Sequence, residues 1–501
     1  MSCEKFSRRT ALALGLAGIG AVSLAQVPGS LQERTTTRRK VAKNIIFCCS
    51  DGMSTGAMTM VDHFSQINEG SRSYWAWLMN QSYAVNGLMD TASLSSSVTD
   101  SAAASSSWGS GCRIINGQVN TYPDGTELKP IWQILKEHGM RVGVATTATV
   151  THATPAGFCI NSMRRDDEAG IAEKYLQAGI DVILGGGERF FSADTREDKK
   201  DLYNQYSRAS YVVARERDEL LKNVGASKML GIFSPSHMPY TVDHTYSAEL
   251  RRDVPTLAEM SRVAIESLRK SPNGFALQIE GARVDHAAHP NDLAGLFYDQ
   301  VAFEEAVKVA IDFALRDGET LVIVTSDHGN ANPGLNGVGR EYGLSNGMFE
   351  TVKGMRSSYQ AMGNELQAAN TVPELQSLFK VKLGLEVSSE HCQQLLDARK
   401  NNPLRGLTLY GYPTAHLAMV LGSYTGVGWT SGAHTSDHTI VTAIGPGAEL
   451  FRGLVKNTDV FHHMLAARDL RFTGNRQITL EEAERMRKDG DTSASVEQHW
   501  L

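Results

Sequence analysis

The stretch Thr320–Gly329, TLVIVTSDHG, shows the pattern that decides the fold of this chain. Its first six residues are an apolar, mostly β-branched run of strand length, and polar residues follow at once. A short continuous apolar run bounded by turn residues is typical of a strand buried on both faces. Asp327 and His328 would then lie at the carboxyl end of that strand, where α/β proteins bind their ligands.

The same arrangement recurs along the chain. Apolar runs that resemble the first one occupy Val41–Ser50, Met140–Thr147, Asp181–Leu184, Gly274–Ile279 and Ile440–Ile444. Helical patterns lie between them and are clearest at Leu257–Lys270 and Asp292–Asp317. Strands that alternate with helices predict an α/β fold, with a large, mostly parallel central sheet covered by helices on both faces.

The 501 residues are enough for about three average domains, or for one large α/β domain with an insertion. Residues 330–347 are rich in Gly and Asn, and residues 350–430 show weaker periodicity. We therefore interpret 26–501 as one domain that carries an insertion at about 331–431, near its C-terminal third.

The first 25 residues have the features of an export signal. Ser7-Arg8-Arg9-Thr10 precedes an uncharged stretch, Ala11–Ala25, that ends in small residues. The stretch is too short to span a bilayer comfortably. The arginine pair favours a twin-arginine signal peptide over an ordinary secretory one. We expect a periplasmic or secreted protein that has no membrane attachment once residues 1–25 are removed.

The charge and the cysteines restrict the function further. The chain has 49 basic and 55 acidic residues, a net charge of −6. This balance argues against nucleic acid as a partner, which usually needs a basic face. An anionic substrate would need positive charge from another source, such as metal ions. The five cysteines beyond the signal form no CxxC motif, so we interpret them as buried thiols, with one disulfide as the alternative.

Several carboxylates and imidazoles follow the predicted strands. Asp285 and His289 are four residues apart, which places both on one face of a helical turn. Asp51, the Asp327-His328 pair and His434 lie beside other apolar runs. Mixed oxygen and nitrogen ligands suit zinc, and an oxygen-rich subsite suits magnesium. Together these residues predict a metal centre at the carboxyl ends of the strands.

Ser101 begins a segment, SAAASSSW, that has the composition of a helix start. A serine at this position is most often a helix N-cap. It can also be a nucleophile, because free backbone amides favour an anion there. No G-x-S-x-G elbow and no neighbouring histidine supply a base. A metal ion that binds the alkoxide could replace one.

These motifs resemble, in order, those of the alkaline phosphatase family of metal-dependent phosphomonoesterases. The resemblance runs from about Asn44 to Gly447. It rests on Ser50-Asp51-Gly52-Met53, Thr99-Asp100-Ser101-Ala102, His152-Ala153-Thr154-Pro155, Glu280-Gly281 with Asp285 and His289, Ser326-Asp327-His328-Gly329, and Gly432-Ala433-His434-Thr435.

The resemblance implies a fold like that of the family, phosphate monoester substrates, a homodimer and three metal ions. One zinc ion would be held by Asp285, His289 and His434. A second zinc ion would be held by Asp51, Asp327 and His328. A magnesium ion would be held by Asp51, Thr154 and Glu280.

The resemblance also implies that Ser101 is the nucleophile and forms a phosphoserine. An arginine should clamp the phosphate through two hydrogen bonds. Arg164 and Arg165 are both candidates, and the spacing from the His-Ala-Thr-Pro motif favours Arg165. His152 and His286 occupy positions that vary within the family. His152 could shift the third site from magnesium toward zinc or cobalt, and His286 could reach the phosphate through water. The alternative is that both histidines are scaffolding.

Three other functions remain as alternatives. A phosphodiesterase or nuclease of the same superfamily more often has a threonine nucleophile and needs room for a second ester group. A sulfatase needs a Cys or Ser in a C/S-x-P-x-R site, and no cysteine here has that context. The third alternative is a non-catalytic phosphate-binding protein. The presence of every expected metal ligand argues against it.

Overall fold

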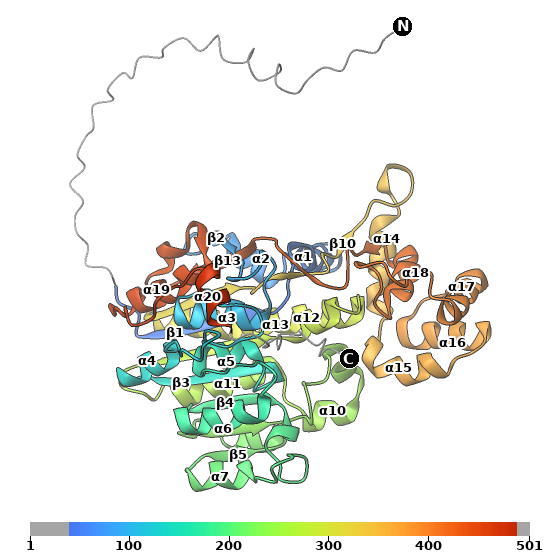
Figure 1. The fold of residues 1–501 in the computed structure, drawn as a ribbon. Helices are drawn as coiled ribbons and strands as arrows, with labels where there is room; N and C mark the ends of the chain where they lie inside the picture. The colour runs from blue at the N-terminus through green and yellow to red at the C-terminus, as the bar shows by residue number, and fades with distance from the viewer. Residues whose placement is uncertain (1–39, 488–501) are drawn as a thin grey trace, which may run out of the picture. The chain divides into compact units, whose positions relative to one another are not determined.

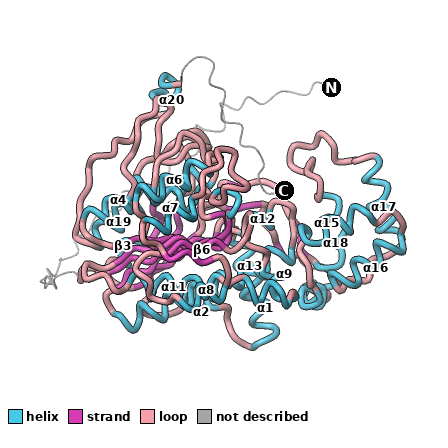
Figure 2. Tube along the Cα trace, turned by 90° about the horizontal axis from the view of Figure 1, so that it is seen from below, coloured by secondary structure: helices cyan, strands magenta, loops and turns pink. Residues whose placement is uncertain are grey.

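The computed structural model describes residues 40–487. The predicted signal peptide, 1–25, lies outside the described residues. The described chain contains a ten-stranded sheet with helices on both sides (Figures 1 and 2). The strands, in spatial order, are β14 (Gly453–Lys456), β2 (Val85–Asp90), β13 (Thr439–Ile444), β8 (Thr320–Thr325), β1 (Asn44–Ser50), β7 (Phe275–Gly281), β3 (Arg141–Thr149), β4 (Val182–Gly186), β6 (Met229–Ile232) and β5 (Val212–Ala214).

The sheet is mostly parallel, as the sequence predicts. Only β13 runs antiparallel to its neighbours, β2 and β8, among the strands of the described sheet. The predicted strands agree with the observed ones to within a few residues. The short strands β5, β6 and β14 and the strand β2 were not predicted.

Alternation along β1 explains the two helical layers. Ile46 and Cys48 belong to the apolar cluster on one face of the sheet, whereas Ile45, Phe47 and Cys49 belong to the cluster on the other. The first face is covered by α1 (Thr55–Glu69), α2 (Tyr74–Met79), α8 (Arg217–Lys222), α9 (Thr241–Tyr246), α11 (Leu257–Leu268) and α13 (Leu293–Asp317). The second is covered by α3 (Ser101–Ser110), α4 (Ile131–Glu137), α5 (Ala153–Cys159), α6 (Glu168–Ala178), α7 (Leu202–Arg208) and α19 (Asn457–Ala467).

The segment between β9 (Gly329–Asn330) and β12 (His434–Thr435) is mainly helical. A two-stranded antiparallel pair, β10 (Gly334–Leu335) and β11 (Val427–Gly428), joins its two ends. Between them lie α14 (Ser345–Phe349), α15 (Tyr359–Ala368), α16 (Val372–Leu383), α17 (Ser389–Lys400) and α18 (Ala415–Thr425). Figure 1 shows these helices as an orange lobe beside the sheet. The exact limits of the insertion predicted at 331–431 stay a prediction.

The remaining helices connect these parts. They are α10 (Ala248–Asp253), α12 (Arg283–Ala288), α20 (Leu480–Met486) and the 3-10 turns Glu188–Phe190, Arg340–Tyr342, Glu350–Gly354 and Ala448–Phe451. All five cysteines in 40–487 are buried free thiols, as the first interpretation of the sequence expects. Among these residues, no helix has both the length and the apolar character needed to cross a bilayer.

Candidate active site

Three buried carboxylates meet where the central strands end. Asp51 follows β1, Asp327 follows β8, and Glu280 lies near the end of β7. β1 pairs with β7 on one side and with β8 on the other, so that Cys49 is in register with both Glu280 and Thr325. All three carboxylates are fully buried. The parallel topology therefore gathers negative charge at one edge of the sheet.

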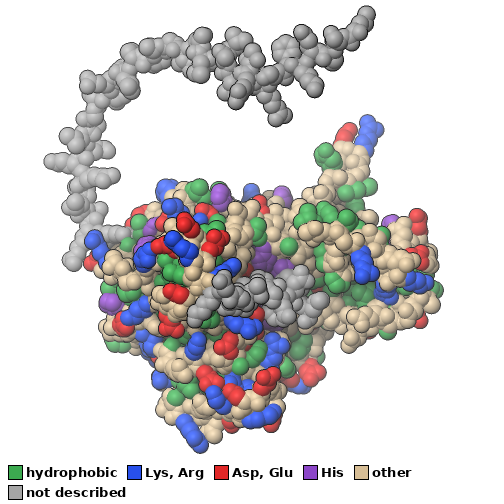
Figure 3. All heavy atoms as spheres, in the orientation of Figure 1, with side chains coloured by type: hydrophobic (Ala, Val, Ile, Leu, Met, Phe, Trp, Pro, Cys, Tyr) green, Lys and Arg blue, Asp and Glu red, His purple; other side chains and the backbone are tan. Residues whose placement is uncertain are grey.

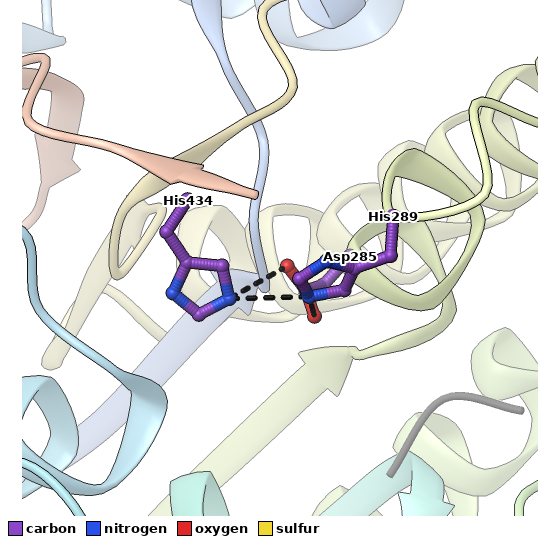
Figure 4. Close-up of side chains that lie close together, drawn as sticks. All are labelled: Asp285, His289 and His434. Atoms are coloured by element: carbon purple, nitrogen blue, oxygen red, sulfur yellow. Dashed lines mark hydrogen bonds and ion pairs between the residues drawn. The ribbon is translucent and has the colours of Figure 1, made fainter. Parts of the chain in front are cut away.

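The first candidate metal group consists of Asp285, His289 and His434 (Figure 4). Asp285 and His289 lie one helical turn apart, and Oδ2 of Asp285 is 3.2 Å from Nε2 of His289. Nε2 of His434 lies 3.2 Å from that same nitrogen and 3.6 Å from Oδ1 of Asp285. The side chains of these three residues, two from α12 and its C-cap and one from β12, therefore face one another.

Backbone carbonyls set the orientation of both imidazoles. Nδ1 of His289 donates to the carbonyl of Gly432, and Nδ1 of His434 donates to the carbonyl of Thr99, each at 2.9 Å. A proton on Nδ1 leaves a lone pair on Nε2, which is the arrangement that histidine metal ligands use. Asn330 donates to Oδ1 of Asp285 over 2.7 Å and fixes that carboxylate.

The second candidate group consists of Asp51, Asp327 and His328. Nε2 of His328 lies 3.1 Å from Oδ2 of Asp327 and 3.6 Å from Oδ1 of Asp51. The other oxygen of Asp327 accepts from the amides of Gly52 and His328, both at 3.0 Å. Oδ1 of Asp51 and Oδ2 of Asp327 accept no hydrogen bond within the described residues.

Burial first, and then repulsion from Asp327, raises the pKa of Asp51 well above its ordinary value. Buried carboxylates this close together need a cation to remain ionised. The donor set and these unsatisfied oxygens fit divalent metal ions.

The third candidate group consists of Asp51, His152 and Glu280. Nδ1 of His152 lies 3.9 Å from Oε1 of Glu280, whose other oxygen accepts from Thr146 at 2.5 Å. Thr154 donates to Oδ2 of Asp51 over 3.3 Å. Burial raises the pKa of Glu280 to about 7. The structure therefore brings the predicted residues Asp51, Thr154 and Glu280 together and adds His152 to them.

Ser101 is the first residue of α3, but it is not the N-cap. Asp100 is the cap, and its Oδ1 accepts from the amide of Ala103 at 2.9 Å. The Ser101 hydroxyl lies 3.3 Å from Nε2 of His328, next to the second candidate group. The N-cap interpretation of Ser101 is therefore wrong. Its side chain faces a metal-ligand cluster from a helix N-terminus, where the helix dipole favours negative charge.

Arg165 faces the same cavity as Ser101, whereas Arg164 is exposed and does not line that cavity. The guanidinium of Arg165 donates to Oδ2 of Asp100 over 3.2 Å and to Nε2 of His152 over 3.0 Å. The Asp100 carboxylate helps to raise the pKa of Arg165 against the opposing effect of burial. The structure thus distinguishes two adjacent arginines that the sequence left open.

The rings of His286 and His237 lie side by side, and the sequence did not single out His237. The rings of His286 and His237 lie 4.3 Å apart, and His152 lies 5.6 Å from His286. Nδ1 of His286 accepts from Arg283 at 3.0 Å, and Nδ1 of His237 accepts from the amide of Thr149 at 3.2 Å. His237 carries no motif of its own. Arg283 lies inside the Glu280–His289 motif, and that position in the motif is the signal that could have identified it.

All of these groups line or adjoin one cavity of about 340 Å³. Its walls include Ser101, Arg165, His237, Asp285 and His434. Figure 3 shows histidine side chains, in purple, gathered in a hollow near the middle of the face. A serine hydroxyl, an arginine and three carboxylate–imidazole clusters around one cavity are the kinds of group that phosphoryl transfer uses, since that reaction depends mainly on positioning and charge stabilisation.

Comparison with known proteins agrees with this class of site. The family model described as alkaline phosphatase matches residues 42–470. Alkaline phosphatase 3 of Bacillus subtilis is 29% identical over 475 residues, which cover 93% of this chain and 98% of the relative. The crystal structure of Thermus thermophilus alkaline phosphatase is 33% identical, with a TM-score of 0.84 over 93% of this chain and 99% of that one. A cold-active alkaline phosphatase from Shewanella sp. is 28% identical, with a TM-score of 0.71 over 85% of this chain and 99% of that one.

The fold and the family define the class of protein as a phosphomonoester hydrolase. This chain belongs to the alkaline phosphatase family.

Proposed function

We propose that the chain hydrolyses phosphate monoesters through a phosphoserine on Ser101, with two zinc ions and one magnesium ion bound. The observation that carries the proposal is the position of the Ser101 hydroxyl, 3.3 Å from His328 and at the N-terminus of α3. Zinc would bind Asp285, His289 and His434, and also Asp51, Asp327 and His328. The third ion would bind Asp51, Thr154 and Glu280, and His152 makes zinc or cobalt the alternative there. When bound, the ions supply positive charge that lowers the pKa of a coordinated hydroxyl and stabilises the attacking and leaving oxygens.

The protein's own groups orient the substrate. Arg165 would bind two phosphate oxygens with its planar guanidinium. Asp100 holds that guanidinium at 3.2 Å and caps the helix that begins with Ser101, so one carboxylate positions both groups. Ser101 would attack phosphorus from the side opposite the leaving alcohol, and water would later cleave the phosphoserine.

The proposal also accounts for an anionic substrate on an acidic chain. Three divalent ions carry six positive charges, and Asp51, Glu280, Asp285 and Asp327 cancel four of them. Arg165 adds one more. Asp100, which pairs with Arg165, takes one away, so the local charge is about +2 before Ser101 ionises, although the whole chain is at −6.

Export and pairing belong to the same proposal. The arginine pair and apolar stretch in 1–25 support twin-arginine export to the periplasm or beyond, and the family resemblance supports a homodimer. Cell fractionation of the full chain and of an Arg8→Lys, Arg9→Lys variant tests the first. Light scattering of the purified protein tests the second.

The deciding experiment compares p-nitrophenyl phosphate with its bis ester, in metal-loaded protein with and without a chelator. We expect turnover of the monoester that the chelator abolishes, and much slower turnover of the diester. Faster turnover of the diester would favour the phosphodiesterase alternative. Phosphate binding without turnover of either ester would favour the non-catalytic one.

A further inference from the structure

The last described segment, residues 471–487, packs over the helix that carries the proposed nucleophile. We name it the C-terminal strap; it ends with α20 (Leu480–Met486). Figure 1 shows α20, in red, over α3, and the two helices contribute residues to one small apolar cluster. The strap follows the last residue of the family match, residue 470.

Asn475 ties the strap to the end of α3. Its Nδ2 atom donates to the carbonyl of Ser110, the last residue of α3, over 2.8 Å and to the carbonyl of Lys129 over 3.0 Å. Its Oδ1 atom accepts from the amide of Lys129 at 2.8 Å. One side chain thus satisfies three backbone groups in two separate segments. Such multiple bonds hold those segments at a fixed separation.

Two neighbouring residues fix the loop that follows α3. We name residues 111–128 the support loop. Gln477 accepts from the amide of Arg113 at 2.7 Å and donates to the carbonyl of the same residue over 3.1 Å. The hydroxyl of Tyr122 donates to the carbonyl of Arg476 over 2.7 Å. The strap therefore holds the support loop at both ends.

Apolar contacts cover the surface between these hydrogen bonds. Ile478 and Ala483 of the strap are 4% and 1% exposed. They belong to a cluster with Ala103, Cys112, Ile114, Ile115, Tyr122 and Leu128. Ala103 lies two residues after Ser101, and its amide is the one that Asp100 caps. The cluster therefore reaches the first turn of the nucleophile's helix.

The other side of the support loop holds the phosphate-binding groups. The amide of Gly117 donates to Oδ2 of Asp100 over 2.9 Å, and Oδ1 of Asn116 accepts from the amide of Asp100 at 3.3 Å. The carbonyl of Gly117 accepts from the amide of Arg165 at 2.9 Å. Asp100 and Arg165, which pair through their side chains, are thus both attached to a loop that the strap fixes.

We propose that the C-terminal strap is a positioning element of the active site, which acts through the support loop on the Asp100–Arg165 pair. The inference rests on the proposed function. Asn475 and Gln477 are its main positioning residues and touch no substrate. Their loss lets the support loop shift, so Arg165 no longer meets the phosphate in one fixed orientation.

The test uses the full, metal-loaded chain with Asn475→Ala and Gln477→Ala combined. We expect kcat/KM for p-nitrophenyl phosphate to fall about tenfold and the Ki of inorganic phosphate to rise by about the same factor, as the loss of several hydrogen bonds predicts. Metal content and the thermal transition show whether the variant is folded and loaded. The matched control is Glu481→Gln with Arg485→Gln, on exposed positions of the same strap. It should match the unaltered chain within about twofold.

A double-mutant cycle separates positioning from simple stabilisation. Arg165→Ala is measured in the unaltered chain and in the Asn475→Ala, Gln477→Ala background. If the strap acts through Arg165, the arginine substitution causes a smaller loss in the second background. Equal losses in both backgrounds, or full activity of the strap variant, would overturn the inference while the proposed function stands. Absence of monoesterase turnover in the intact chain would overturn both.

Discussion

The Oγ atom of Ser101 lies 3.3 Å from Nε2 of His328, although the two residues are 227 positions apart in the chain. The first is the opening residue of α3, and the second lies three residues after β8. This contact connects the proposed nucleophile to the second candidate metal group.

Ser101→Ala should abolish the phosphoenzyme. We expect kcat/KM to fall by at least about 1000-fold, because nucleophile and metal centre act as one unit. Acid quenching with labelled substrate should trap phosphoserine in the unaltered chain and in the Ser107→Ala control, but not in Ser101→Ala. Ser107→Ala is the matched control, since that hydroxyl donates to the carbonyl of Ala103 within α3. Label that persists in the Ser101 variant would rule out the assignment.

Arg165 and Arg164 offer a natural pair for the phosphate clamp. Arg165→Ala should lower kcat/KM about 10- to 100-fold and raise the Ki of inorganic phosphate, because a bidentate charged contact is lost. Arg164→Ala should change both by less than about twofold, since that side chain is exposed. Steady-state kinetics of the two variants decide the matter, and equal effects would reject the assignment of Arg165.

His152→Asp should change the metal preference of the third site. A carboxylate replaces an imidazole beside Glu280, so the ligand set becomes richer in oxygen and favours magnesium over zinc or cobalt. Elemental analysis after dialysis against mixed metals measures the bound ratio. An unchanged ratio would mean that His152 does not contact the third ion. The control for the added negative charge is His138→Asp, at the exposed C-terminal end of α4.

Metal removal should make stability depend on pH. Burial raises the pKa of Glu280 from 4.5 to about 7 in the metal-free site. A carboxyl with a raised pKa in the folded state favours folding when protonated. Stability is therefore lost as pH rises from about 4.5 through about 7. We expect the EDTA-treated protein to unfold several degrees lower at pH 8 than at pH 5.5.

Glu280→Gln tests the source of that pH dependence. The amide cannot ionise, so the variant should flatten the pH profile of the metal-free protein in scanning calorimetry. The Glu137→Gln control removes an exposed carboxylate and should leave the slope unchanged. If the Glu280→Gln variant shows the same pH dependence as the unaltered chain, the dependence comes from other carboxylates of the site.

The fold was predictable because each central strand is buried on both faces. Residues 320–325 and 44–50 are buried along their whole length and apolar between their end residues, which distinguishes them from half-exposed strands. Strand β2, which lies between β14 and β13, escaped prediction because its residues are partly exposed and mixed in character. The short β5, with three residues, gives too little pattern to detect.

The order of residues alone places carboxylates and imidazoles directly after apolar runs of strand length. Parallel strands end at the same edge, so Asp51, Glu280 and Asp327 had to meet. Which of their neighbours turn toward the cavity depends on the folded chain. It placed Arg165 rather than Arg164 there, made Asp100 rather than Ser101 the helix cap, and brought the strap against the support loop. These choices depend on backbone direction and on contacts between distant segments, which no local pattern of residues encodes.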